Sequence, residues 1–216
     1  MMGRLGKRSK GLLIRFQKVT VAALLAALAL VMTVQPSGAQ LGDILKAPKT
    51  LIDRAIEARS TADIVKDNRI VIDINAIMAD VGTINASTEI YEQKLLITGI
   101  FADQETHDAF YEKVKHVEGV KELFWHALVL SDEARKRRKA ELLGWQDVLV
   151  LETKVDIEMV STRGVADVNF RTAADSFGTI YLMGRARSEE ELEKAITSVR
   201  NTENVARVVS YAFVRP

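Results

Sequence analysis

Two segments of the sequence match each other at a constant offset of 85 residues, and this internal repeat limits the possible folds more than any other feature. The segment Leu95-Leu-Ile-Thr-Gly99 aligns with Ile180-Tyr-Leu-Met-Gly184 without a gap. Further along, Val120 aligns with Val205, so apolar positions coincide as well. We therefore expect the second half of the chain to repeat the fold of the first.

Each copy divides into the same predicted elements. Apolar residues near a 3.6-residue period predict a first helix, at Ile64, Ile70, Ile74 and Ile77 in one copy and at Val148, Leu151, Val155 and Met159 in the other. Alternating apolar residues then predict two strands joined as a hairpin. The turn of the hairpin falls at Glu92-Gln93 in the first copy and at residues 175–178 in the second.

The second helix of each copy has a predicted N-cap, Asp103 or Ser188. Ser188 and Glu191 also have the spacing of a capping box. Gly119 and Asn204, which both tolerate a left-handed backbone, then lead into a third strand, such as 123–130. The sequence thus predicts an α+β fold of two αββαβ units, each a three-stranded mixed sheet with two helices packed on one face.

This arrangement resembles the BON domain of bacterial envelope proteins. The resemblance rests on Leu95–Gly99, Val117-Glu-Gly-Val120, Ile180–Gly184 and Ser188–Glu191. It implies BON domains at 61–131 and 145–216, joined by a basic linker or helix at 132–144. It also implies phospholipid-membrane binding, a role in envelope integrity or in tolerance of osmotic and other stress, and no catalysis. The anchoring cysteine of the lipoprotein relatives is absent, because the chain has no cysteine.

The first 39 residues have the pattern of a cleaved signal peptide. Six cations precede residue 19, and the sixteen residues 19–34 carry no charge. Ser37 and Ala39 are small residues at the positions that a signal peptidase reads, so we expect cleavage after Ala39 and a periplasmic protein, peripheral on the membrane. An uncleaved anchor is the alternative. Residues 40–60 are expected to form a spacer helix.

A cationic run lies between the two copies and is followed by large apolar residues. The candidate lipid-binding residues are Arg135, Lys136, Arg137, Arg138, Lys139, Leu142 and Trp145. Cations attract anionic headgroups, while Leu and Trp enter the membrane interface, so the expected partner is an anionic phospholipid surface. The alternative is a solvated helical linker whose leucines pack on one domain. The resemblance adds that the first helix of the second domain contacts lipid in the lipoprotein relatives.

Both faces of each predicted sheet are apolar, although only one face would be covered by helices. Phe124, Leu128, Tyr211 and Phe213 are therefore candidate partner-binding residues, for envelope proteins or for a second copy of the chain. The favoured alternative is that the helix-free faces pack on each other or on the 40–60 helix. A protein-interaction adaptor or periplasmic stress chaperone is the competing function.

The sequence offers no catalytic or metal site. Without cysteine there is no thiol nucleophile and no Cys-based zinc site. Of the three histidines, His107 and His116 are nine residues apart on one predicted helix, about 180° apart around its axis, so they cannot share a metal. His107 is interpreted as an interfacial or core residue. We expect no enzyme activity, no cofactor and no nucleic-acid partner.

Overall fold

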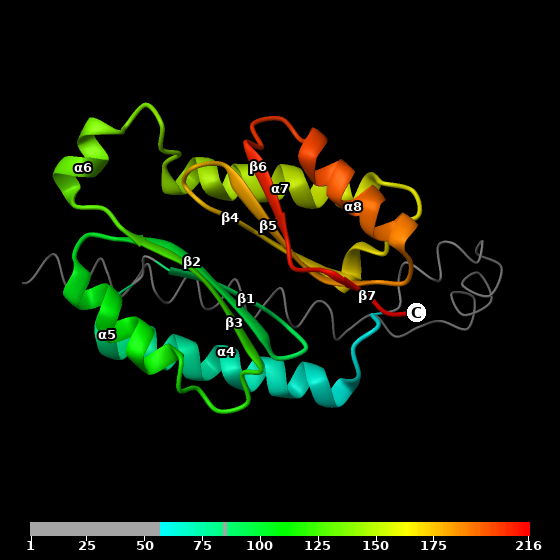
Figure 1. The fold of residues 1–216 in the computed structure, drawn as a ribbon, viewed down its shortest axis with the longest axis horizontal. Helices are drawn as coiled ribbons and strands as arrows, with labels where there is room; N and C mark the ends of the chain where they lie inside the picture. The colour runs from blue at the N-terminus through cyan, green and yellow to red at the C-terminus, as the bar shows by residue number, and fades with distance from the viewer. Residues whose placement is uncertain (1–56, 84–85) are drawn as a thin grey trace, which may run out of the picture. The chain divides into compact units, whose positions relative to one another are not determined.

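The computed structural model describes residues 57–83 and 86–216. The predicted signal peptide (1–39) and nearly all of the predicted spacer helix (40–60) lie outside the described residues, so both stay predictions. In the described residues, two mixed sheets each carry helices on one face (Figure 1). The predicted α+β class is confirmed.

The first half consists of two helices and one three-stranded sheet. Helix α4 (Thr61–Val81) precedes the hairpin of β1 (Ala86–Tyr91) and β2 (Lys94–Phe101). Helix α5 (Gln104–Val114) then leads into β3 (Glu122–Val129). Strand β2 is central, since it pairs antiparallel with β1 and parallel with β3. This is the predicted order of helix, two strands, helix and strand.

The second half has the same order after a short connecting helix, α6 (Asp132–Arg137). Helix α7 (Trp145–Ser161) is followed by a 3-10 turn, η1 (Asp167–Asn169). The hairpin of β4 (Phe170–Ala174) and β5 (Thr179–Ala186) comes next and is antiparallel. Both halves therefore have a hairpin between their two main helices.

Helix α8 (Glu189–Asn201) and two short strands complete the second half. Strands β6 (Arg207–Ser210) and β7 (Phe213–Val214) both pair in parallel with β5. The prediction of three strands is wrong here, because the last strand is interrupted at Tyr211, giving a fourth strand. The interruption lies at the residue whose ring stacks on Phe124 of the first sheet.

The pairing register is equivalent in the two halves. Leu95 pairs with Leu123, and Ile180 pairs with Val208, so both partners are displaced by 85 residues. The backbone of Asn204 is left-handed (φ 71°), as is that of Gly119 (φ 87°) at the equivalent position. The offset seen in the sequence thus corresponds to a repeated strand pairing.

The predicted N-caps are confirmed, but the capping box is not. Asp103 accepts a hydrogen bond from the backbone N–H of the third residue of α5 (2.7 Å), and Ser188 Oγ accepts one from Glu191 N (3.2 Å). The Glu191 carboxylate does not return to Ser188. It accepts from Ala166 N (2.7 Å) and Arg187 N (2.8 Å), because it is buried against the turn that precedes η1. It therefore joins α8 to that turn.

The helix-free faces of the two sheets pack against each other, and both sheets belong to one compact unit. Leu96 of β2 forms a buried cluster with Tyr181 and Met183 of β5. The rings of Phe124 and Tyr211 extend this cluster and stack with centroids 3.8 Å apart. The described chain therefore has helices outside and two sheets inside (Figure 1), which explains why both sheet faces are apolar.

Candidate membrane-binding surface

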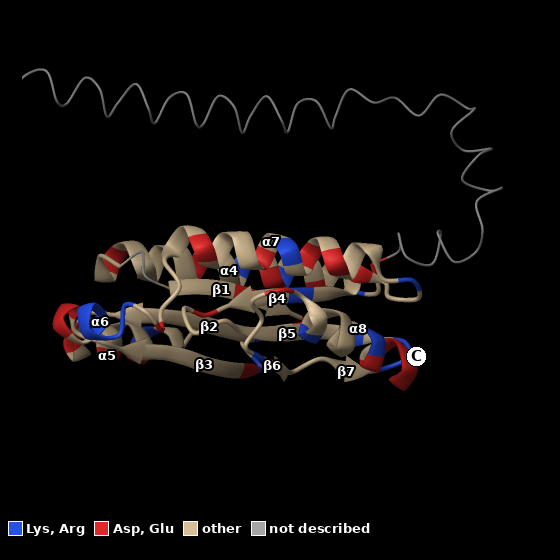
Figure 2. Cartoon of the chain, turned by 90° about the horizontal axis from the view of Figure 1, so that it is seen from above, with Lys and Arg blue, Asp and Glu red and all other residues tan. Residues whose placement is uncertain are grey.

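Helix α6 carries most of the cationic run predicted to bind lipid. Ser131 caps its start by accepting a hydrogen bond from Ala134 N (3.3 Å). The cations lie in the last turn, where the helix dipole favours positive charge. In Figure 2 the ribbon of α6 is largely blue, the colour of Lys and Arg, with the red of acidic residues beside it. The residues of the run that face solvent are Arg135, Lys136, Arg137 and Lys139.

Arg138 differs from the other four cations because it contacts an aromatic ring of the second half. Its guanidinium carbon lies 4.9 Å from the ring centroid of Phe177, in the β4–β5 loop. Its Nε donates to Glu141 Oε2 over 2.9 Å. Arg138 therefore fixes the linker against the second half.

The apolar residues after the run lie in different surroundings. Leu142 is half-buried, whereas Trp145, the first residue of α7, is 61% exposed. Between them, Leu143 packs on the core of the second half, and its N–H donates to Ser176 O over 2.7 Å. The anchored linker thus presents Trp145 to solvent directly after the cations.

The outer face of α7 carries exposed apolar residues alongside the exposed Gln146, Thr153 and Asp156, and these apolar residues were not predicted from the sequence. Besides Trp145, its exposed apolar residues are Leu149, Val150, Ile157 and Val160, each between 43% and 63% exposed. With Trp145 they fall within an arc of about 140° around the helix. Among residues 57–83 and 86–216, no helix combines the length and apolarity that a membrane span needs.

The candidate partner-binding residues have packing roles within the chain. Phe124 and Tyr211 stack on each other between the sheets. Phe213 packs edge-on against Tyr91, with ring centroids 6.5 Å apart. Leu128 is 45% exposed and is the most accessible of the four. The intramolecular packing favoured from the sequence is thus observed, and partner binding through these residues stays a prediction.

The side chains of His107 and His126 are held by contacts with aromatic residues. His107 lies between Phe101 and Trp125, and its Nε2 accepts a hydrogen bond from Trp125 Nε1 over 3.1 Å. His126 Nε2 lies 2.6 Å from the Tyr211 hydroxyl. In the described part of the chain, no three His, Asp or Glu residues are grouped as metal ligands. The interfacial interpretation of His107 agrees with its surroundings.

A buried carboxylate organises the start of the first half. Asp67 is 1% exposed and accepts four hydrogen bonds. The donors are Glu92 N (3.0 Å), Gln93 N (2.8 Å), Gln93 Nε2 (2.7 Å) and Arg59 Nη1 (2.8 Å). Asp67 thus ties helix α4 to the β1–β2 turn and to the segment before the helix.

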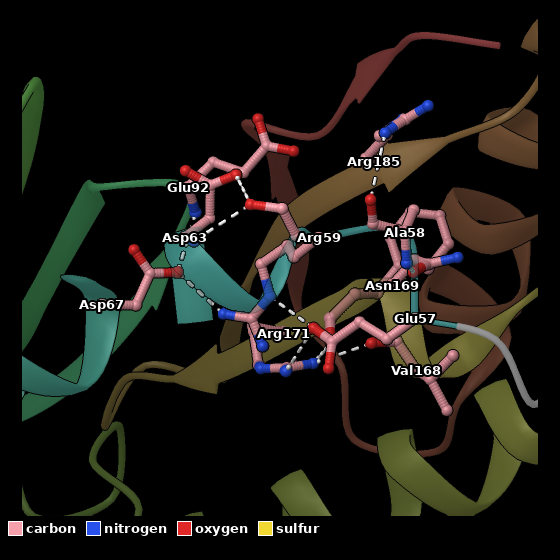
Figure 3. Close-up of polar contacts among 12 residues, drawn as sticks. Glu57, Ala58, Arg59, Asp63, Asp67, Glu92, Val168, Asn169, Arg171 and Arg185 are labelled. Atoms are coloured by element: carbon pink, nitrogen blue, oxygen red, sulfur yellow. Dashed lines mark hydrogen bonds and ion pairs between the residues drawn. The ribbon is translucent and has the colours of Figure 1, made fainter. Parts of the chain in front are cut away.

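Residues 57–59 connect this cluster to the second sheet (Figure 3). Ala58 N donates to the buried Asn169 Oδ1 over 2.6 Å, and Arg185 Nη1 donates to Ala58 O over 3.3 Å. Glu57 pairs with Arg171 over 3.3 Å. The segment is therefore held by both halves. Sequence reasoning missed it because its partners in the second half lie more than 100 residues away.

Glu89, on β1, provides a pH-dependent contribution to stability. Burial raises its pKa to about 7; Arg171 opposes the rise, while Glu152 and Asp156 add to it. Between pH 4.5 and 7 the folded chain therefore binds more protons than the unfolded chain, so the free energy of unfolding falls as pH rises, by up to about 3 kcal/mol. We expect Glu89→Gln to raise the free energy of unfolding at pH 8 and to flatten this dependence.

Urea unfolding at pH 5 and pH 8 measures this effect. The exposed Glu118→Gln is the matched control and should leave the pH dependence unchanged. An unaltered pH dependence in Glu89→Gln would show that Glu89 ionises without cost in the folded protein.

The second half matches a known domain family, described as BON domain, over residues 147–216. Residues 147–216 form a BON domain. This domain contains nearly all of α7, both hairpin strands, α8 and the two final strands. The predicted resemblance is confirmed for this half, and a BON domain at 61–131 stays a prediction.

The sequence matches none of the curated proteins. Two solved structures of CdsD, a structural protein of the type III secretion system of Chlamydia trachomatis, are similar to the chain at 10% identity. One covers 68% of this chain and 93% of that chain, with a TM-score of 0.28. The other, of the CdsD C-terminal domain, covers 68% and 98%, with a TM-score of 0.30. Structural similarity at TM-scores this low supports no statement about function.

Proposed function

We propose that this chain is a non-enzymatic protein of the bacterial envelope that binds anionic phospholipid membranes and supports envelope integrity or stress tolerance. The proposal rests mainly on one observation: the exposed cations of α6 directly precede the exposed apolar face of α7. The BON domain at 147–216 supports it, because phospholipid binding is known for this family. Two tandem BON domains and export to the periplasm by a signal peptide cleaved after Ala39 belong to the same proposal.

Electrostatic attraction between the exposed cations and anionic headgroups is one contribution to this binding. A cation near an anionic membrane surface is worth about 1 kcal/mol, so the four exposed cations contribute about 4 kcal/mol. Without residues 1–39 the chain has 24 basic and 29 acidic residues, a net charge of −5. An anionic surface should therefore repel the protein as a whole, and only a local patch can bring it to the membrane.

Co-sedimentation with phosphatidylglycerol-containing vesicles tests the proposal. We expect the parent to bind these vesicles, to bind pure phosphatidylcholine vesicles little, and to lose affinity as salt rises. Changing Arg135, Lys136, Arg137 and Lys139 together to Gln should lower the affinity by roughly 10³-fold. Arg138 stays in place because it anchors the linker. Trp145→Ala should weaken binding while leaving the salt dependence unchanged, since it removes apolar contact only.

A matched control removes the same amount of charge elsewhere. The exposed cations to change to Gln are Lys66, Arg69, Lys113 and Lys115. This control should bind vesicles as the parent does. If the α6 variant also binds like the parent while remaining folded, α6 is only a solvated linker and the proposal fails.

The adaptor or chaperone function has less support. It relied on apolar sheet faces being free, and the described residues show these faces packed on each other through Leu96, Phe124 and Tyr211. The observation that favoured that function is therefore explained by packing within the chain.

A further inference from the structure

A pocket of about 450 Å³ lies at one end of the contact between the two sheets. Its floor is the helix-free face of the first sheet, where Ile100 and Leu128 lie. The linker and the start of α7 supply Leu143 and Trp145, and the β4–β5 loop supplies Phe177. The volume is within the range of small-molecule sites. Two of its apolar side chains, Leu128 and Trp145, remain 45% and 61% exposed.

The acidic groups of the pocket wall already have donors within the protein. Glu152 accepts from Ala174 N over 2.9 Å. Asp175 accepts from the Phe177 and Thr179 N–H groups and from the Tyr181 hydroxyl, over 2.8 to 3.0 Å. These carboxylates hold the β4–β5 loop in place. The rest of the lining is mostly apolar, with Ser87, Thr98, His126 and Ser176 as its other uncharged polar residues.

Positive charge is concentrated on one side of this mostly apolar lining. Arg135 lines the pocket from α6. Arg138 lies over the ring of Phe177, which also lines the pocket. A mostly apolar cavity with guanidinium groups on one side is complementary to a molecule that joins one hydrocarbon chain to an anionic head.

We propose that this pocket binds one acyl chain of an anionic membrane lipid, with the lipid's acidic headgroup at Arg135. The inference rests on the proposed membrane binding and deepens it. The outer face of α7 gives general adhesion to the surface, and the pocket takes up a single lipid chain. The same linker serves both, because it contributes Arg135 and Trp145.

The probe for this site is 11-(dansylamino)undecanoic acid, a single-chain anion whose fluorescence rises in apolar surroundings, used below its micelle concentration. We expect the parent to bind it and lysophosphatidylglycerol to displace it. Leu128→Trp fills the pocket from an exposed strand position and should weaken probe binding at least tenfold. Leu128→Glu, which adds a negative charge without adding volume, should weaken it as well. Arg135→Gln should weaken it severalfold.

Ile157→Ser is the matched control, because Ile157 lies on the outer face of α7 and does not line the pocket. It should lower vesicle binding and leave probe binding unchanged. Probe binding of parental strength in folded Leu128→Trp and Leu128→Glu would overturn the pocket proposal. Vesicle binding by the parent without any probe binding would also overturn it while leaving the proposed function intact. If the parent binds the probe but no anionic vesicles, the proposed function fails.

Discussion

Replacing Asp67 with Ala should lower the free energy of unfolding by about 3 to 5 kcal/mol, the cost of breaking a buried ion pair. The substitution removes the acceptor of four hydrogen bonds in the first half. The side chain of Arg59, which is 7% exposed, would lose one of its two carboxylate partners. Urea unfolding at pH 7 measures the loss.

The large effect is expected because Asp67 also stabilises an unfavourable turn. Glu92 and Gln93 both have positive φ, 50° and 66°, at a two-residue turn where Asn-Gly is the preferred sequence. The Asp67 carboxylate accepts hydrogen bonds from both of their backbone N–H groups. Asp73→Ala on the exposed side of α4 is the control, with an expected change within about 0.5 kcal/mol. A loss below 1 kcal/mol in Asp67→Ala would contradict this role.

Gly184→Ala should destabilise the protein by about 4 kcal/mol or prevent folding. A Cβ at residue 184 would lie 2.2 Å from Asn169 O and 2.8 Å from Phe170 Cα. Both atoms are backbone, and β5 is the central strand of its sheet, so neither side can move away. The φ of 129° adds strain for any residue with a side chain.

Gly82→Ala separates the cost of the positive φ from the cost of the close backbone contact. Gly82 also has a positive φ, 76°, but a Cβ there meets nothing within 4 Å. It should therefore cost only the conformational strain, about 1 to 2 kcal/mol. Thermal unfolding of the two variants compares them directly. Equal losses of stability in Gly82→Ala and Gly184→Ala would show that the backbone around residue 184 moves at little cost to accommodate a Cβ.

The regular elements could be predicted because their signals are local. The period of Val148, Leu151, Val155 and Met159 identified the buried side of α7, and all four residues are buried. Asp103 identified the start of α5 because an N-cap acts within one turn. The BON resemblance followed from such local motifs and their spacing.

The candidate site was predicted only in part, because its other components depend on distant contacts. The cations and Trp145 form a compositional cluster that is visible in the sequence. Helix α7 is apolar on two sides, so periodicity identified the stripe that packs on the sheet and gave no signal for Ile157 and Val160. Two of the partners of Asp67, Glu92 and Gln93, are 25 and 26 residues away in sequence, and no local pattern relates them to Asp67.

The packing of the two sheets has a consequence for how the chain folds during synthesis. The first sheet is complete at Val129, but its covering sheet needs β5 and β6, which are made up to 81 residues later. At ordinary rates of translation this takes several seconds. During that interval Leu96 and Phe124 have no partner and are open to other unfolded chains. The first half is therefore the part of the molecule most at risk of misassembly before the chain is finished.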